Sequence, residues 1–129
     1  MTNTDATFRY VGLAHVELPM PAGAEDEARA FYRRVLGMDE VPKPPDLAAR
    51  GGCWFRCGVH ELHLSVDPDV VRGKQHPAVL VEGIDDLGER LRLAGCRADW
   101  DSRLPGFRRF YTFDPFGNRI EFLEPAARG

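Results

Sequence analysis

The chain has 129 residues, of which 43% are hydrophobic and 29% charged, and its formal net charge at pH 7 is −3. This length fits one domain that buries a core without disulfide support, and the composition is globular rather than disordered or fibrous. No apolar run approaches the roughly 20 residues that span a bilayer, and the polar segment 1–7 has no secretory signal pattern. The slight acidity argues against a nucleic-acid partner, and we expect no membrane partner.

The cysteine count favours a reducing compartment. Cys53, Cys57 and Cys96 are an odd set, which fits free thiols in the cytoplasm better than a disulfide framework. Cys53 and Cys57 lie four residues apart, but the second cysteine pair that a zinc ribbon requires is missing. The sequence therefore predicts a cytoplasmic protein without a structural zinc site.

The first half of the chain alternates between strand and helix patterns. A β-rich run ends at Pro19 and Pro21. A helical pattern then begins with acidic residues and ends with Arg33 and Arg34, which is the charge order that the helix dipole favours. Gly37 follows, and glycine is the preferred residue just after a helix. The predicted elements are a strand at 10–18, a helix at 24–36, an irregular loop at 41–45, and strands at 52–57 and 59–66.

The second half repeats this order. Asp85 or Asp86 is predicted to cap a helix that Gly95 ends. The residues Asp-Pro-Phe-Gly-Asn then have the composition of a turn between two strands. The predicted elements are a strand at 76–81, a helix from about 85 to 95, a strand at 107–113, a turn at 114–118 and a strand at 119–124.

The matching order of elements in the two halves predicts an internal duplication. The helix-ending glycines Gly37 and Gly95 align, and His63 and Glu121 then lie 26 residues after their respective glycines. The fold class is therefore α+β, with two βαβββ modules, about 8–67 and 75–125, in one domain. Chance repetition is the alternative.

The duplication also aligns four side chains that bind metals. His15 and His76 lie on the predicted first strand of each module, while His63 and Glu121 lie on the last strands. A lone strand histidine is more often an interior hydrogen-bonded residue than a ligand. Together, however, three imidazoles and one carboxylate at equivalent positions form a ligand set for a divalent transition metal.

Several neighbouring residues have competing interpretations. Glu61 has the same strand parity as His63 and is the competing ligand, whereas His60 has the opposite parity and is predicted at the surface or at the edge of the core. Three arginines, Arg56, Arg108 and Arg109, are exposed by default, but one of them on the inner strand face would bind an anionic substrate group. No nucleotide-binding glycine loop or nucleophile elbow occurs, so no further cofactor site is predicted.

The sequence resembles the vicinal oxygen chelate superfamily, which comprises glyoxalases, bleomycin resistance proteins and extradiol dioxygenases. The resemblance covers nearly the whole chain and rests on four segments: Gly12-Leu-Ala-His-Val, Phe31-Tyr-Arg-Arg-Val-Leu-Gly-Met, His76-Pro-Ala-Val-Leu-Val and Asp114-Pro-Phe-Gly-Asn-Arg-Ile-Glu-Phe-Leu-Glu.

This resemblance implies a cupped, U-shaped mixed sheet, with helices outside, around a divalent ion such as Zn, Ni, Fe, Mn or Co. It implies metal ligands at His15, His63, His76 and Glu121. It also implies a homodimer, with the site either within one chain or shared between two.

The implied function is that of a metal-dependent lyase or isomerase of glyoxalase type. It would act on a small molecule chelated through vicinal oxygens, with Glu121 as the catalytic base. Glyoxalases usually carry glutamate at the position that His63 occupies here, so this chain departs from the glyoxalase pattern. The alternatives are an extradiol-type dioxygenase with Fe(II) and a metal-free drug-binding or resistance protein.

Overall fold

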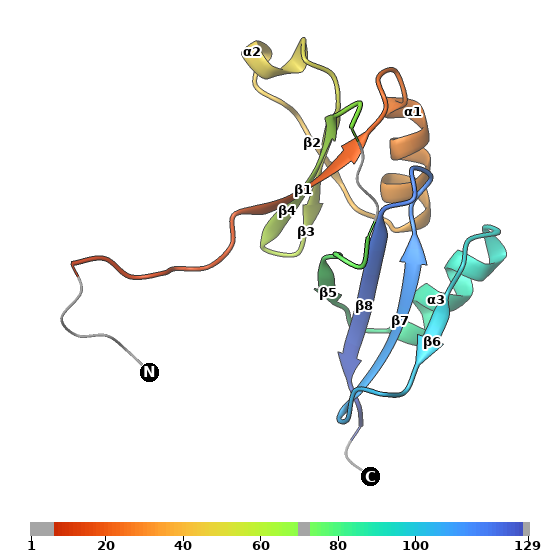
Figure 1. The fold of residues 1–129 in the computed structure, drawn as a ribbon. Helices are drawn as coiled ribbons and strands as arrows, with labels where there is room; N and C mark the ends of the chain where they lie inside the picture. Colours follow the sequence, from red (N-terminus) through yellow and green to blue (C-terminus); the bar gives the residue numbers. More distant parts are fainter. Residues whose placement is uncertain (1–6, 70–72, 128–129) are drawn as a thin grey trace.

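The computed structural model describes residues 7–69 and 73–127 and consists of two four-stranded mixed sheets with helices beside them (Figure 1). The first half contains β1 (His15–Met20), α1 (Glu25–Ala28), the π-helix η1 (Arg29–Val35), β2 (Glu40–Val41), α2 (Pro45–Ala48), β3 (Cys53–Cys57) and β4 (His60–Val66). The second half contains β5 (Ala78–Leu80), α3 (Ile84–Leu93), β6 (Asp99–Asp101), β7 (Phe107–Phe113) and β8 (Arg119–Pro125).

Both sheets have the same topology. The strand order is β1-β4-β3-β2 in the first sheet and β5-β8-β7-β6 in the second. In each sheet the first strand pairs in parallel with the last, and the remaining pairs are antiparallel. The predicted α+β fold with two βαβββ modules is confirmed.

One face of each sheet packs into a core that the two halves share. The fully buried side chains of this core come from both sheets and include Phe55, Leu64, Phe110 and Ile120. Helix η1 contacts β3, and α3 contacts β7 and β8, so the helices cover the core face. Polar side chains lie on the opposite face of each sheet.

A buried hydrogen bond ties the halves together. The hydroxyl of Tyr32 in η1 donates to Asp114 Oδ2 at 2.7 Å, 82 residues further along the chain. Burial is the main cause that raises the pKa of Tyr32 well above its ordinary value, with the Asp114 carboxylate adding to the shift. Asp114 also accepts from the backbone N–H groups of Phe116 and Asn118 and from Asn118 Nδ2.

The N-terminal strand differs from the prediction. Residues 10–14 are not in a strand, while β1 continues through Pro19 to Met20. The reason is pairing: β1 is in register with β4 from His15↔Glu61 to Met20↔Val66, and the ladder ends where the Ala14 carbonyl accepts a long hydrogen bond, 3.4 Å, from the Glu61 N–H.

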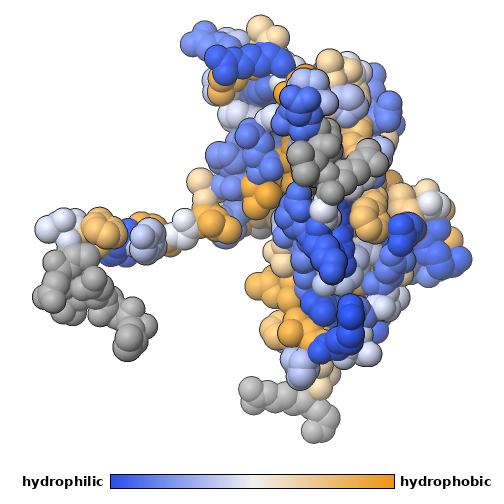
Figure 2. Space-filling view, viewed as in Figure 1, coloured by the Kyte–Doolittle hydropathy of each residue, from blue (hydrophilic) through white to orange (hydrophobic). Residues whose placement is uncertain are grey.

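Residues 7–14 instead form an extended arm. Figure 1 shows this arm leaving the body at the start of β1, and Figure 2 shows it projecting from the rest of the molecule. Four of its large hydrophobic side chains are exposed: Phe8 by 67%, Tyr10 by 93%, Val11 by 85% and Leu13 by 72%. Such a concentration of exposed apolar surface is typical of an interaction site.

The second half departs from the prediction at three places. Strand β5 begins at Ala78, so His76 lies in the preceding loop rather than on a strand. Helix α3 has no side-chain cap from Asp85 or Asp86; instead Glu124 Oε2 accepts from the backbone N–H groups of Gly83 and Ile84, at 2.6 and 3.2 Å. Strand β6 was not predicted.

The remaining sequence predictions agree more closely with the structure. The helix predicted at 24–36 is present as α1 and η1, and β3, β4, β7 and β8 match their predicted ranges within one residue. The loop predicted as irregular at 41–45 instead contributes the end of β2 and the start of α2. None of the helices in the described ranges has the length and apolar character needed to cross a bilayer.

Candidate metal centre

The candidate ligands lie on the sheet faces that turn away from the core, which we call the polar faces. On β4, Leu62 and Leu64 point into the core, so the alternating positions Glu61 and His63 lie on the polar face of the first sheet. On β8, Phe122 is in the core and Glu121 is on the polar face of the second sheet. Strand parity thus places the two pseudo-equivalent residues, His63 and Glu121, on corresponding faces.

The first sheet brings His15 and His63 together. Their rings stack with centroids 4.1 Å apart and an interplanar angle of 12°. Trp54, opposite His63 in the register of β3 and β4, stacks on the other side of the His63 ring at 4.0 Å. His63 Nε2 donates to Glu61 Oε1 at 2.9 Å. The two residues that competed as ligands, His63 and Glu61, are therefore direct hydrogen-bond partners.

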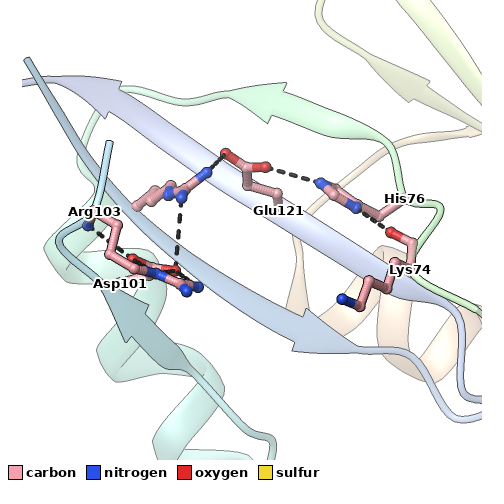
Figure 3. A network of polar contacts seen from close by, with 6 residues as sticks. Lys74, His76, Asp101, Arg103 and Glu121 are labelled. Atoms are coloured by element: carbon pink, nitrogen blue, oxygen red, sulfur yellow. Dashed lines mark hydrogen bonds and ion pairs between the residues drawn. The ribbon is translucent and has the colours of Figure 1, made fainter. Parts of the chain in front are cut away.

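The second sheet brings His76 and Glu121 together (Figure 3). His76 Nε2 lies 3.0 Å from Glu121 Oε1, and His76 Nδ1 donates to the backbone oxygen of Lys74 at 2.7 Å. The other Glu121 oxygen accepts from Arg109 Nη1 at 3.3 Å. Although His76 is outside β5, these contacts hold its ring against the sheet, and its edge also meets Tyr111.

The hydrogen-bond chain continues away from Glu121. Arg109 Nη2 lies 3.6 Å from Asp101 Oδ2, and Arg103 binds the same carboxylate through its backbone N–H and its guanidinium. These hydrogen bonds from Arg103 are the main reason that the pKa of Asp101 is well below its ordinary value. Arg109 thus lies between two carboxylates on the polar face.

The two pairs do not form one centre within a single chain. In the described ranges 7–69 and 73–127, no three side chains of His, Cys, Asp or Glu form a group that could hold a metal ion. A cleft of about 730 Å³ between the halves is lined by His15 and Glu61 but by none of the other three candidate ligands. A second cleft, of about 670 Å³, lies beside α3 and contains none of the four.

The donor set itself suits a divalent metal. Each pair supplies two nitrogen or oxygen donors of the kinds that zinc, nickel, iron and manganese accept, and two pairs together supply four. Cysteine does not compete at this face, because Cys53 lies in the core, where burial raises the pKa of its thiol to about 11, and Cys57 and Cys96 pack against the core. The residues therefore fit half of a metal site on each sheet and not a complete site in one chain.

The structure sorts the remaining candidates by face. His60 is exposed, as predicted. Arg109 lies beside Glu121, Arg56 lies 4.0 Å from Glu61, and Arg108 is on the helix side, where it pairs with Asp85. Sequence reasoning missed Trp54, Tyr111 and Arg119 as polar-face residues. The available signal was their strand parity relative to His63 and Glu121. For Trp54 and Tyr111, which lie on neighbouring strands, this signal can be used only when the pairing register is known.

Comparison with known proteins identifies the family of this chain. Residues 12–122 match the sequence profile of the Glyoxalase/Bleomycin resistance protein/Dioxygenase superfamily. Among curated proteins, none matches the sequence.

Solved structures share the fold. A glyoxalase family protein from Bacillus anthracis is 45% identical, with a TM-score of 0.87 over 92% of this chain and 99% of that chain. A lactoylglutathione lyase from Agrobacterium tumefaciens is 25% identical, with a TM-score of 0.69 over 88% and 92% of the two chains. The fosfomycin resistance protein FosX from Listeria monocytogenes is 17% identical, with a TM-score of 0.73 over 92% and 96%, and shows likeness of fold alone.

The sequence profile covers most of the chain and agrees with the duplicated sheets and with the B. anthracis structure. This chain belongs to the Glyoxalase/Bleomycin resistance protein/Dioxygenase superfamily.

Proposed function

We propose that the protein is a metal-dependent enzyme of glyoxalase type, a lyase or isomerase that acts on a small molecule with two neighbouring oxygens. His15, His63, His76 and Glu121 are the proposed ligands, and two chains together provide a complete set. The proposal is supported by one observation above all: the polar face of each sheet brings together two side chains of kinds that bind metals, and within residues 7–69 and 73–127 no three such side chains form a group that could hold an ion.

A homodimer is the proposed arrangement. The pair His15 and His63 of one chain would face the pair His76 and Glu121 of a second copy. The extended arm at 7–14 supports this arrangement, because it leads directly into His15 and exposes four large apolar side chains that its own chain does not cover. If His15 meets the partner's sheet, the arm is carried onto the partner's surface, where those side chains become buried.

The chemistry follows from the ligand set and from the neighbours of Glu121. A divalent ion held by these ligands would supply Lewis-acid chemistry to two neighbouring substrate oxygens. Glu121 is the proposed base: its carboxylate is positioned by His76 on one oxygen and by Arg109 on the other, so its direction is fixed before substrate arrives. His63 is held between His15 and Trp54, which restricts its ring in the same way.

Metal analysis tests the ligand assignment. Protein purified without chelator is expected to contain about one divalent ion per chain, and His63→Ala is expected to weaken metal binding more than Glu61→Ala. Both changes remove one end of the same hydrogen bond, so each is a matched control for the other. Absence of metal, together with unchanged thermal stability in EDTA, would contradict the proposal, and a larger effect of Glu61→Ala would assign Glu61 as the ligand.

A mixing experiment tests the shared site. One variant carries His15→Ala with His63→Ala, and the other carries His76→Ala with Glu121→Ala. Each variant alone is expected to bind no metal tightly, whereas a mixed dimer regains one complete set of ligands. Recovery is measured by metal content after joint refolding, with native mass spectrometry to count mixed dimers. Mixed dimers that recover no metal would rule out a site shared between chains.

A second candidate function, binding of a planar ligand without catalysis, is favoured by the ring stack on the first sheet. Trp54, His63 and His15 form a continuous series of parallel rings, and Lys43 lies 5.9 Å from the centroid of Trp54. Such a surface favours aromatic ligands by stacking. Tight binding of an aromatic compound by EDTA-treated protein, with no turnover after metal loading, would favour this function. Oxygen uptake with catechols and Fe(II) would identify a dioxygenase instead.

A further inference from the structure

Tyr111 lies at the centre of an arginine cluster on the polar face of the second sheet. The guanidinium carbon of Arg119 lies 4.0 Å from the centroid of the Tyr111 ring, and that of Arg109 lies 5.4 Å from it. Tyr111 is opposite Glu121 in the register of β7 and β8, and its ring also contacts His76 edge-on at 5.3 Å. The cluster of Arg109, Tyr111 and Arg119 is therefore adjacent to the proposed metal ligands of this sheet.

The two arginines differ in their partners. Arg109 is shared between Glu121 and Asp101, but its Nε is buried and has no hydrogen-bond partner. Arg119 forms no ion pair with any carboxylate of the described residues, and its ring contact with Tyr111 holds its guanidinium over the sheet. An arginine that is positioned by an aromatic ring and lacks a carboxylate partner retains donors for a ligand.

The charge of the surroundings favours a negatively charged ligand. Asp101 is already bound by Arg103, so it does not neutralise Arg109 fully. Across Arg103, Arg109 and Arg119, three positive charges face the two negative charges of Asp101 and Glu121. If Glu121 also binds a metal ion, the excess of positive charge on this face increases further.

We propose that Arg119 and Arg109, whose guanidinium groups both lie beside the ring of Tyr111, form a subsite for an oxyanion, namely a carboxylate, phosphonate or phosphate group of the substrate. A planar guanidinium matches such groups because it donates two parallel hydrogen bonds. Placing this group beside Glu121 orients the rest of the molecule toward the metal ligands. The assignment to a substrate rests on the proposed function, whereas the oxyanion subsite itself does not require a metal.

Binding of phenylphosphonate to EDTA-treated protein tests the subsite. Affinity is measured by calorimetry, and the binding position by amide chemical shifts in ¹⁵N-labelled protein. Unmodified protein is expected to bind at about millimolar concentration, with shifts centred on β7 and β8. Arg119→Gln is expected to weaken binding about tenfold or more, because it removes the charged, forked donor, and Arg119→Lys is expected to lie between the two.

Two controls keep the result specific. Arg92→Gln removes an arginine of α3 that pairs with Glu89, and it is expected to leave the affinity unchanged. Benzyl alcohol, which has the ring without the anion, is expected to bind much more weakly than phenylphosphonate. The proposal is overturned if Arg119→Gln binds like the unmodified protein, if Arg92→Gln loses as much affinity, or if benzyl alcohol binds equally well.

The use of metal-free protein separates this test from that of the proposed function. If the purified protein contains no metal, the proposed function is contradicted, but the phenylphosphonate titration still tests the oxyanion subsite. Conversely, protein that holds metal but does not bind phenylphosphonate retains the proposed function and loses the oxyanion subsite. The thermal midpoint of Arg119→Gln is expected to fall only slightly, because the side chain loses its ring contact with Tyr111 but has no ion-pair partner among the described residues to lose.

Discussion

The two sheets of this protein share a topology and differ in how they hold equivalent side chains. In the first sheet, His63 is fixed mainly by rings, between His15 and Trp54. In the second sheet, Glu121 is fixed by charge, between His76 and Arg109. Strand β1 has six residues and carries His15 within its ladder, whereas β5 has three and leaves His76 outside. A duplicated backbone thus preserves positions while the local chemistry around them diverges.

The difference suggests complementary roles for the halves. A face of stacked rings binds planar or apolar parts of a ligand, and a face rich in arginine and carboxylate binds charged parts and transfers protons. One sheet alone offers only one of these properties. The comparison between the sheets can be tested by breaking the link between them and then by altering each half separately.

The largest expected effect comes from breaking the link. Asp114→Ala removes a buried carboxylate that accepts four hydrogen bonds, one of them from Tyr32 of the other half. We expect a loss of about 3–5 kcal/mol in the free energy of unfolding, measured by urea denaturation, because several buried donors lose their acceptor. Asp85→Ala, which removes an exposed carboxylate paired with Arg108, is the control and is expected to leave the midpoint unchanged. Similar midpoints for both variants would contradict the link.

The next effect compares the two first-strand histidines. His15→Ala and His76→Ala are each expected to lower metal affinity by about a hundredfold, because even residues that only support metal ligands cost 10–100-fold when removed. The measurement is a competition titration with a chelating dye. His60→Ala, at an exposed position near the start of β4, is the control. An effect at only one of the two histidines would show that the halves do not contribute equally.

A smaller effect is expected when the link is weakened rather than removed. Tyr32→Phe keeps the ring in the core and deletes its hydrogen bond to Asp114. The expected loss is about 1.5–3 kcal/mol, the usual contribution of a hydrogen bond to a charged group. The same urea titration measures it, and a loss as large as that of Asp114→Ala would mean that the remaining three hydrogen bonds of Asp114 contribute nothing.

The smallest effect concerns the start of α3. Glu124→Ala removes the carboxylate that accepts from Gly83 and Ile84, and the expected cost is about 1 kcal/mol, as for loss of an N-terminal cap. Asp86→Ala alters the residue that the sequence predicted as a possible cap and is expected to have a smaller effect, because its side chain makes no capping hydrogen bond. Thermal denaturation distinguishes the two variants, and the reverse order would support the sequence prediction.

The sequence predicted most elements because their signals are local. Alternation of apolar and polar residues identifies β4 and β8, and the position of Gly37 and Gly95 marks the helix ends. The errors occurred where a partner distant in the sequence decided the outcome. The strand predicted from residue 10 begins only at His15, where β4 becomes available for pairing, and the cap of α3 comes from β8.

By itself, the sequence determined the duplication and the four residues that occupy its equivalent positions, since both follow from spacing and strand parity. Only the tertiary structure decided how those residues are grouped, with His15 beside His63 and His76 beside Glu121. It also showed that Arg109, rather than Arg56 or Arg108, binds Glu121. The physical reason is that parity gives the face of a strand, whereas contacts across strands and between sheets depend on register and packing.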